Sequence, residues 1–416
     1  MSLHSLRGFR DLLPPDSALF TSIEAAAREV FALYGYQELR VPTIELKELF
    51  VKATGDTTDI VEKEMYAFTD GGGREVAVRP EGTPGVVRAY IENNLGQTGR
   101  NGKYFYIGNM FRAERPQAGR YREFEQIGAE QIGNASPYAD AETITMLVRL
   151  LEKAGVSGCS VVLNSLGCGE CRKAYRETLL NYLRLNTATL CEPCKGRIER
   201  NPMRALDCKI DGPVLAEKAP RLSLCPACAG HFSRTQELLN ISGVEYQVNT
   251  SLVRGLDYYT STVFEVRSSA LGSQDAVCGG GRYDDLVKSM GGPAAAAIGW
   301  AVGVDRMAML LKDKPAAENA PKTFIVAAAK EAGTKAFALL TAMRAAGISS
   351  DFSNFELSLK SQMRSADKSG AAFALIIGED ELKAGTVAVK LLKEKGEQLS
   401  VAIADAPSEI SKRLSA

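Results

Sequence analysis

The spacing of apolar residues in the first 165 positions predicts two helices and several strands. Apolar side chains recur with a helical period from Ser17 to Tyr34, and a second helix is expected from Asp140 to Ala154. Because most of the strand-like runs follow one another without an intervening helix, we expect an antiparallel sheet. Pro42 inside the first run indicates a sheet edge, a bulge or an interface. The strand-like runs occupy residues 38–45, 74–80, 103–114, 123–133 and 157–165.

The pattern changes twice beyond these strands. A cysteine-rich segment comes first, and strand-like runs then return and end in an apolar segment rich in Gly and Ala. A Pro- and Ala-rich stretch typical of a linker follows, and after it strands and helices alternate, which favours a small α/β domain. We therefore expect an α+β fold. Its expected parts are a main domain (1–165 and 240–312), an insertion (166–239), a linker (313–321) and an α/β domain (322–416).

Composition excludes several classes of protein. The chain has 416 residues, enough for two or three domains with buried cores, and its 45% hydrophobic and 24% charged residues exclude wholesale disorder. It has no apolar run of membrane-spanning length, and charge and proline near the N-terminus argue against a signal peptide. We therefore expect a cytoplasmic protein with no membrane partner. The 50 basic and 50 acidic residues cancel, so net charge gives no indication of nucleic acid.

Seven of the nine cysteines lie between positions 168 and 228 and include three C-x-x-C pairs. In a reducing compartment such pairs indicate tetrathiolate zinc before they indicate disulfides. The alternative is a set of reduced thiols packed in a small domain. The segment 168–234 is also locally basic, with 12 basic and 7 acidic residues. Our candidate Zn²⁺ ligands are Cys191, Cys194, Cys225 and Cys228, with Cys168, Cys171 and Cys208 as substitutes.

An arginine-rich hairpin is predicted between residues 111 and 130. It holds four arginines within eleven residues, and the rigid guanidinium fork matches phosphate oxygens. The alternative is a solvated hairpin whose Arg and Glu side chains pair at the surface. The four arginines are Arg112, Arg115, Arg120 and Arg122.

Three later segments carry further candidate chemistry. Arg254 lies among apolar residues shortly before Tyr258 and Tyr259, and strand alternation would place Arg254 and Tyr258 on one face of a sheet. Three consecutive glycines at 279–281 allow a backbone to approach a ligand, although tight turns use glycines equally often. Arg306 begins an expected helix, where it can bind phosphate or pair with a neighbouring acid.

Taken in order, these segments resemble the histidyl-tRNA synthetase family of class II aminoacyl-tRNA synthetases. The resemblance covers nearly the whole chain, and LVRGLDYYT and FRAERPQAGRYREFEQ are its most specific parts. It implies a class II antiparallel-sheet catalytic domain, a Cys-rich and largely helical insertion, and a C-terminal α/β anticodon-binding domain. VPTIE corresponds to motif 1, residues 111–130 to motif 2 and GWAVGVDR to motif 3. LVRGLDYYT and AVCGGGRYD look like the two histidine-specific motifs.

The resemblance implies ATP-dependent ligation of histidine to tRNA(His) through histidyl-adenylate. By family position, Arg112 would bind the α-phosphate, Arg254 would act on its other side as the electrostatic catalyst, and Arg306 would hold the γ-phosphate. Glu114 is a candidate for the adenine edge or a metal. Mg²⁺ would neutralise the remaining phosphate charge.

The resemblance also implies a histidine pocket. Its residues by family position are Glu81, Gly82, Thr83 and Gln126 for the ammonium group, Glu130 and Tyr259 for the imidazole, and Tyr258 and Tyr283 for the walls. A site that hydrogen-bonds a polar substrate group rejects analogues that lack the group by roughly 10⁴–10⁵, so no editing domain is required. Without the motif, core packing would be the preferred interpretation of the tyrosines.

On the RNA side, the motif 2 loop of the family lies near the acceptor end of the tRNA. Gln117, Arg120 and Arg122 are the candidates for that contact. The basic insertion is expected to contact the tRNA backbone through several arginines and lysines. Motif 1 in the family builds a two-fold interface, so a homodimer is expected.

The main alternative is the non-catalytic regulatory subunit of histidine biosynthesis, a paralogue with the same core fold. That paralogue generally loses the Arg of LVRGLDYYT and lacks the anticodon domain. Arg254 and the α/β segment 322–416 are both present in this sequence. These two features favour the synthetase.

Overall fold

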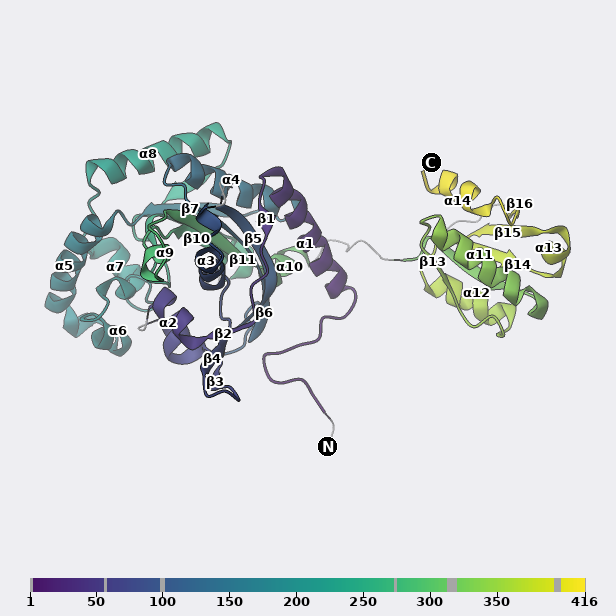
Figure 1. The fold of residues 1–416 in the computed structure, drawn as a ribbon, viewed down its shortest axis with the longest axis horizontal. Coiled ribbons are helices and arrows are strands. Elements are labelled where there is room, and N and C mark those ends of the chain that lie inside the picture. Colours follow the sequence, from purple (N-terminus) through teal and green to yellow (C-terminus); the bar gives the residue numbers. More distant parts are fainter. Residues whose placement is uncertain are drawn as a thin grey trace. The chain divides into compact units, whose positions relative to one another are not determined.

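The computed structural model contains two compact units, Met1–Ala316 and Ala317–Ala416 (Figure 1). It describes residues 3–55, 58–97, 102–272, 275–312, 320–392 and 398–415. Most of the expected linker, 313–319, lies outside the described residues. Within the described residues, no helix combines the length and the apolar character that crossing a membrane requires.

The first unit is built on an eight-stranded sheet with the order β1-β5-β6-β11-β10-β9-β7-β8. All pairings between β5 and β7 in this order are antiparallel, whereas β1 and β8 add to the two edges in parallel. The expected antiparallel sheet is thus confirmed. The strands are β1 (Gln37–Glu38), β5 (Gly102–Phe111), β6 (Glu123–Ile132), β7 (Ser160–Ser165), β8 (Tyr246–Val248), β9 (Thr260–Arg267), β10 (Ala276–Arg282) and β11 (Ala297–Gly303).

Helices cover both faces of this sheet. Phe105 points to one face, where it stacks on Phe31 with ring centroids 4.3 Å apart, while its neighbour Tyr106 belongs to the core on the other face. This alternation is the period-2 pattern of a strand buried on both sides. The first face carries α1 (Asp16–Leu33), α4 (Pro137–Lys153) and α10 (Val304–Leu311), and the second carries α3 (Thr83–Glu92) and α9 (Leu286–Ser289).

Two strand predictions are wrong in detail. The run 38–45 does not form one strand, because β1 ends before Pro42 and β2 (Ile44–Leu46) begins after it. Arg254 and Tyr258 do not alternate on a strand, since residues 249–259 form an irregular connection between β8 and β9. β2 belongs to a separate small sheet, in which the central strand β4 (Glu75–Val78) pairs with β2 and with β3 (Ala67–Thr69). The remaining helices of the unit are α2 (Lys47–Thr54), η1 (Ile60–Glu64), η2 (Leu95–Gln97) and η5 (Ser269–Leu271).

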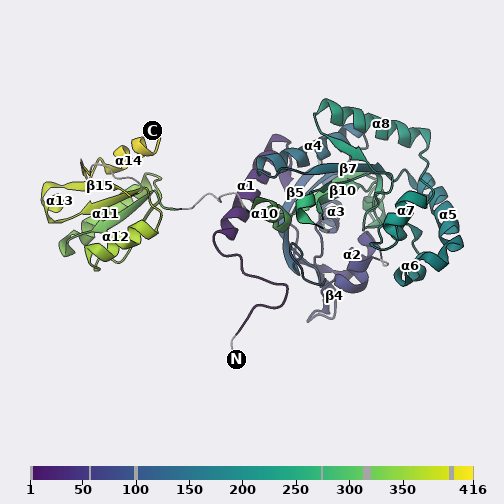
Figure 2. The same ribbon diagram turned by 180° about the vertical axis from the view of Figure 1, so that it is seen from behind.

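The segment between β7 and β8 is helical. Leu179, Leu183, Ile198 and Leu215 form a small core of its own. Its last helix packs against α4, as both ribbon views show (Figures 1 and 2), and His231 Nε2 lies 2.8 Å from the carboxylate of Asp140 on α4. The elements are α5 (Gly169–Leu185), η3 (Thr187–Thr189), α6 (Glu192–Arg197), η4 (Pro202–Ala205), α7 (Gly212–Lys218) and α8 (Pro226–Ile241).

The second unit is an α/β domain with a five-stranded sheet of order β13-β12-β14-β15-β16. The first three strands are parallel and the last two antiparallel. Strands and helices alternate as the sequence predicts. The elements are β12 (Thr323–Ala327), η6 (Lys330–Ala332), α11 (Gly333–Ala345), β13 (Ser350–Phe352), α12 (Leu359–Lys368), β14 (Phe373–Ile377), α13 (Glu379–Ala384), β15 (Thr386–Leu391), β16 (Leu399–Ala402) and α14 (Ala406–Ser415).

Candidate active site

A cavity of about 670 Å³ opens in the first unit and collects residues from segments far apart in the sequence. It is bordered by the ends of β5 and β6, the turn before α3, the 249–259 connection, β10 and the start of α10. Of the predicted site residues, it is lined by Glu81, Thr83, Arg112, Glu114, Arg120, Gln126, Arg254, Tyr258, Tyr259, Tyr283 and Arg306.

Arg254 is a buried cation in this cavity. Its guanidinium forms an ion pair with Glu265 on β9 and lies 5.8 Å from the ring centre of Tyr259. Burial alone would lower the pKa of Arg254, but the Glu265 carboxylate and the other groups around it, Tyr259, Cys278 and Asp207, together raise the pKa above its ordinary value. A Cβ atom on Gly279 would overlap the guanidinium, so this glycine leaves room for the arginine. Arg254 is therefore fixed and charged.

Three further arginines form a positive cluster in one part of the cavity. Arg112 Nε donates to the carbonyl of Pro80 at 2.9 Å, and Arg306 donates to the carbonyl of Ala276. Burial and the nearby charge of Arg120 lower the pKa of Arg306. An anion bound beside Arg306 would offset the repulsion between these guanidinium groups, so this part of the cavity suits phosphate oxygens.

The turn that follows Arg112 holds the other motif 2 residues. Arg120 forms an ion pair with Glu114 at 2.9 Å, and a bridge between Gln117 and Arg120 closes the turn. Arg122 instead donates to the main-chain carbonyls of Glu114 and Arg7, both at 3.3 Å. Among the described residues, Gln117 and Arg122 are not part of the cavity wall.

Another part of the cavity is acidic and aromatic. Thr83 Oγ1 donates to one oxygen of Glu130 at 2.6 Å, and the Tyr283 hydroxyl donates to the other. The Tyr258 hydroxyl donates to Glu81 at 3.0 Å. Burial raises the pKa of Glu81 to about 7 and that of Glu130 to about 8. Glu130 is 1% exposed and lies behind the wall of the cavity.

Two buried oxygens of residues that line the cavity have no hydrogen-bond partner among the described residues. They are Oε1 of Glu81 and Oε1 of Gln126. A buried acceptor without a partner costs about 1–3 kcal/mol, so these atoms favour a ligand that donates hydrogen bonds. Gly82 does not line the cavity, because the ring of Tyr106 occupies the space where its side chain would lie.

Comparison with known proteins identifies the family. A family model described as histidyl-tRNA synthetase matches residues 8–307. The chain is 53% identical over 408 residues to a histidine–tRNA ligase of Elusimicrobium minutum, and the match covers 98% of each chain. The chain belongs to the histidyl-tRNA synthetase family. The predicted class II fold and ligase class are thereby confirmed, and the non-catalytic regulatory subunit is not favoured.

Further similarities extend over both units. An anticodon-binding-domain model matches residues 322–413. A histidine–tRNA ligase of Geobacter sulfurreducens is 46% identical, over 98% of this chain and 99% of its own. The structure of an S. aureus histidyl-tRNA synthetase matches with a TM-score of 0.83 and 32% identity, over 98% of this chain and all of that one.

Within this synthetase fold, the helical insertion also lines the cavity, which sequence reasoning missed. Arg204 and Asp207, which follow α6, are lining residues. Arg204 lies 3.2 Å from Asp257 in the 249–259 connection. Glu265 was missed as well, although a carboxylate within the apolar strand TSTVFEVR was a signal that could have found it. Nothing in the spacing of the insertion pointed to the catalytic cavity.

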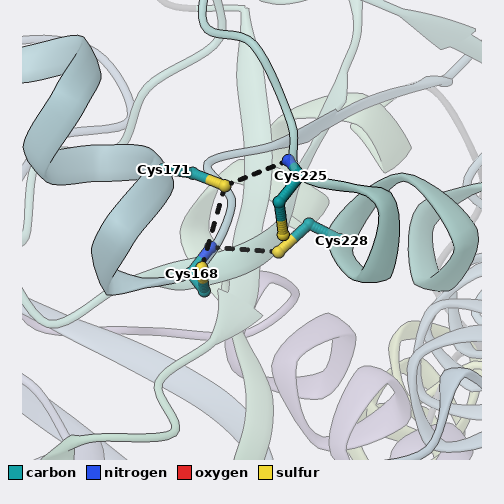
Figure 3. A group of neighbouring side chains, drawn as sticks. All are labelled: Cys168, Cys171, Cys225 and Cys228. Atoms are coloured by element: carbon teal, nitrogen blue, oxygen red, sulfur yellow. Dashed lines mark hydrogen bonds between the residues drawn. The ribbon is translucent and has the colours of Figure 1, made fainter.

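The predicted grouping of the zinc ligands is wrong. Cys191 and Cys194 lie with Cys208 and Asp211, whereas Cys225 and Cys228 lie with Cys168 and Cys171 (Figure 3). The reason is topological, because the pair at the start of α5 meets the pair at the start of α8, and the middle pair folds onto the segment before α7. Spacing along the chain did not reveal which pairs meet.

Proposed function

We propose that this chain activates histidine with ATP and transfers it to the 3′ end of tRNA(His). The observation that carries this proposal is the pairing of a phosphate-attracting arginine cluster with unpartnered buried acceptors in one cavity. The reaction needs both parts, because the histidine carboxylate must attack the α-phosphate of ATP. Family membership supports the same assignment.

Histidine is proposed to bind in the acidic part of the cavity. Its ammonium group would donate to the unpartnered oxygens of Glu81 and Gln126. Its imidazole would contact Tyr259 and, by displacing the Thr83 or Tyr283 hydroxyl from the carboxyl group, Glu130 behind the wall. Tyr258 and Tyr283 would form the walls, with ring centroids 5.7 Å apart. The ammonium charge would favour the ionised form of Glu81, whose pKa is raised by burial in the free protein.

ATP is proposed to bind as its Mg²⁺ complex in the part of the cavity that holds the arginine cluster. Negative charge builds up on the α-phosphoryl group during the attack, and cations already in position stabilise it without reorganisation. Arg112 and Arg254 would lie on the two sides of the α-phosphate and Arg306 at the γ-phosphate. Glu114 is engaged by Arg120, which supports a role in orienting this arginine beside the adenine site.

Transfer RNA is proposed to reach the cavity past the insertion. A second hollow of about 470 Å³ adjoins Arg254 and is lined by Arg172, Lys173, Arg176 and Arg200. Such a basic surface attracts the phosphate backbone near the acceptor stem. Of the motif 2 residues, Arg120 is the best supported for the acceptor end, because it alone of the three predicted lines the cavity. The second unit would bind the anticodon.

A homodimer and a cytosolic location complete the proposal. Ile44, Leu46 and Phe68 on the small sheet are each about half exposed, at 51%, 52% and 46%, and an apolar patch at motif 1 suits a two-fold interface. The cysteines are free, as expected in a reducing compartment. Light scattering after size exclusion measures the oligomeric state directly.

Histidine-dependent exchange of pyrophosphate into ATP tests the proposed activity. The full chain should catalyse exchange with histidine and not with the other amino acids, and should then charge tRNA(His). Exchange that depends on another amino acid, or no exchange, would contradict the proposal. Histidinol lacks the carboxylate and should therefore bind without supporting exchange.

A further inference from the structure

We propose that the insertion holds two structural Zn²⁺ ions. The proximal site consists of Cys168, Cys171, Cys225 and Cys228, and the distal site of Cys191, Cys194, Cys208 and Asp211. Within each group the four potential ligand atoms all lie within 4.8 Å of one another. The two groups use all seven clustered cysteines, and Asp211 completes the second group.

The proximal site has the geometry of a tetrathiolate ion site (Figure 3). The Sγ atoms of Cys168 and Cys171 are 3.7 Å apart. Four Zn–S bonds of about 2.3 Å in a tetrahedron place the sulfurs about 3.8 Å apart. The two C-x-x-C pairs stand at the first turns of α5 and α8, so their sulfurs come from two helix starts that converge on one point.

Main-chain N–H groups also orient the proximal sulfurs. The amide of Cys168 donates to Cys228 Sγ and the amide of Cys225 donates to Cys171 Sγ, both at 3.2 Å. Each amide belongs to one pair and contacts a sulfur of the other pair. Such contacts stabilise the negative charge of thiolates and hold ligands in position around a metal.

The distal site is formed in the same way with one carboxylate. The Sγ atoms of Cys191 and Cys208 are 3.6 Å apart, and Cys194 is fully buried. The amide of Cys191 donates to both carboxylate oxygens of Asp211, at 3.2 and 3.1 Å, which turns that carboxylate toward the sulfurs. Asp211 is itself 6% exposed. Three thiolates and one carboxylate are a ligand set that Zn²⁺ accepts.

Other uses of these cysteines fit less well. A disulfide needs sulfurs about 2.05 Å apart, far closer than the measured pairs. An iron–sulfur cluster contains several metal atoms, which separate the ligating sulfurs more widely than a single ion does. Hard cations such as Mg²⁺ prefer oxygen ligands. A single ion that binds sulfur ligands in a tetrahedron fits both groups of cysteines better than these alternatives, and Zn²⁺ is such an ion.

The two ions would have different structural effects. The proximal ion joins the two ends of the insertion where it leaves the catalytic sheet after β7. The distal ion joins α6 to the segment before α7, and the chain between these ligands carries Arg204 and Asp207 into the catalytic cavity. The distal ion would therefore position residues beside Arg254. The metal assignment itself does not depend on the proposed reaction.

Metal analysis of the full-length protein tests the inference. Protein expressed with added zinc and purified without chelator should contain two Zn²⁺ per chain by plasma mass spectrometry. Cys171→Ser and Cys194→Ser should each lower this to one, and the double variant to none. Cys159 lies outside both groups, so Cys159→Ser is the matched control and should keep two ions.

A second measurement avoids dependence on variants that fail to fold. Exchange of Co²⁺ into the wild-type protein should give the intense thiolate-to-metal absorption of tetrahedral sites, with two Co²⁺ bound per chain. Wild-type protein with less than half an ion per chain and nine freely titrating thiols would overturn the proposal, as would intact-mass detection of disulfides within either group. If histidine-dependent exchange persists in such protein, the zinc proposal alone fails.

Discussion

Arg254 is held in the cavity by Glu265, and the second oxygen of Glu265 is held by Arg267, whose Nε donates to it at 2.8 Å. One carboxylate therefore orients two arginines. Only Arg254 faces the cavity, because Arg267 is not among its lining residues and is 33% exposed. The pair therefore allows a comparison between the cation proposed to act in catalysis and a cation outside the cavity.

Arg254→Ala should lower the rate constant of histidine-dependent pyrophosphate exchange by about 10²–10³-fold, the loss typical of removing one transition-state stabilising group. Arg267→Ala is the matched control and should change the rate less than threefold. Binding of ATP, measured by calorimetry, should weaken much less than the rate constant falls, because the charge that Arg254 stabilises develops during the attack. Equal losses in both variants would show that Arg254 acts only through Glu265.

The second prediction concerns the pH dependence of stability at Glu130, which is buried and whose pKa is raised to about 8. The carboxyl group of Glu130 holds its proton more tightly in the folded chain than in the unfolded chain. Its contribution to the free energy of unfolding is therefore fully present below its ordinary pKa of 4.5 and is lost as the pH rises through about 8. Glu130→Gln removes the free-energy cost of ionising a buried carboxyl group at alkaline pH. The variant should therefore unfold at a higher temperature than the wild type at pH 8.5, and at a similar temperature at pH 5.

The same Glu130→Gln variant should lose histidine activation, with kcat/KM for histidine falling by about 10²-fold as a polar contact to the imidazole is lost. A variant that gains stability while losing activity cannot be explained by misfolding. Calorimetric unfolding and pyrophosphate exchange at both pH values provide the measurements. An unchanged kcat/KM for histidine would contradict the proposed role of Glu130 in binding histidine.

The site could be predicted from the sequence only where residues are consecutive in a motif. Arg112, Arg254 and Arg306 were found because each stands in a recognisable segment, and the cavity brings all three together. The partners that fix them were not found. Glu265 was missed because its relation to Arg254 arises only when the 249–259 connection folds back over β9.

The same limit explains the wrong predictions of the strand at Arg254 and of the grouping of the cysteines. The strand-like runs predicted β5 and β6 well, because successive side chains of these strands enter the cores on the two faces of the sheet. Period-2 alternation failed around Arg254, where glycine and turn geometry override the pattern. The C-x-x-C pairs were recognised in the sequence. Which pairs lie together depends on how α5, α6 and α8 pack, and the spacing of the cysteines does not predict that packing.

The basic hollow beside Arg254 gives a third prediction, for tRNA. Lys173→Glu combined with Arg200→Glu should raise KM for tRNA at least tenfold and make its increase with salt less steep, because two contacts to the phosphate backbone are lost and fewer counterions are released on binding. Pyrophosphate exchange, which needs no tRNA, should stay within twofold. The control is Arg149→Glu with Lys153→Glu on α4, which reverses the same charge outside this hollow. An unchanged KM for tRNA would refute the contact.

The contact between the insertion and the catalytic connection gives the last prediction. Arg204 lies 3.2 Å from Asp257, is 11% exposed, and shares that carboxylate oxygen with the amide of Asn201, which donates at 3.0 Å. Breaking such a partly buried pair loosens the connection that carries Arg254. Arg204→Ala should therefore lower kcat/KM for ATP in exchange about tenfold, which corresponds to about 1.4 kcal/mol.

A double-mutant cycle decides whether this loss arises from the pair. Arg204→Ala combined with Asp257→Asn should lose little more than either change alone, because each removes the same interaction. Lys195→Ala is the control within the insertion, since Lys195 pairs with Glu192 on α6. Zinc content should stay the same in all of these variants, because none of the three residues belongs to either group of proposed ligands. Fully additive losses would show that Arg204 acts on the active site by another route.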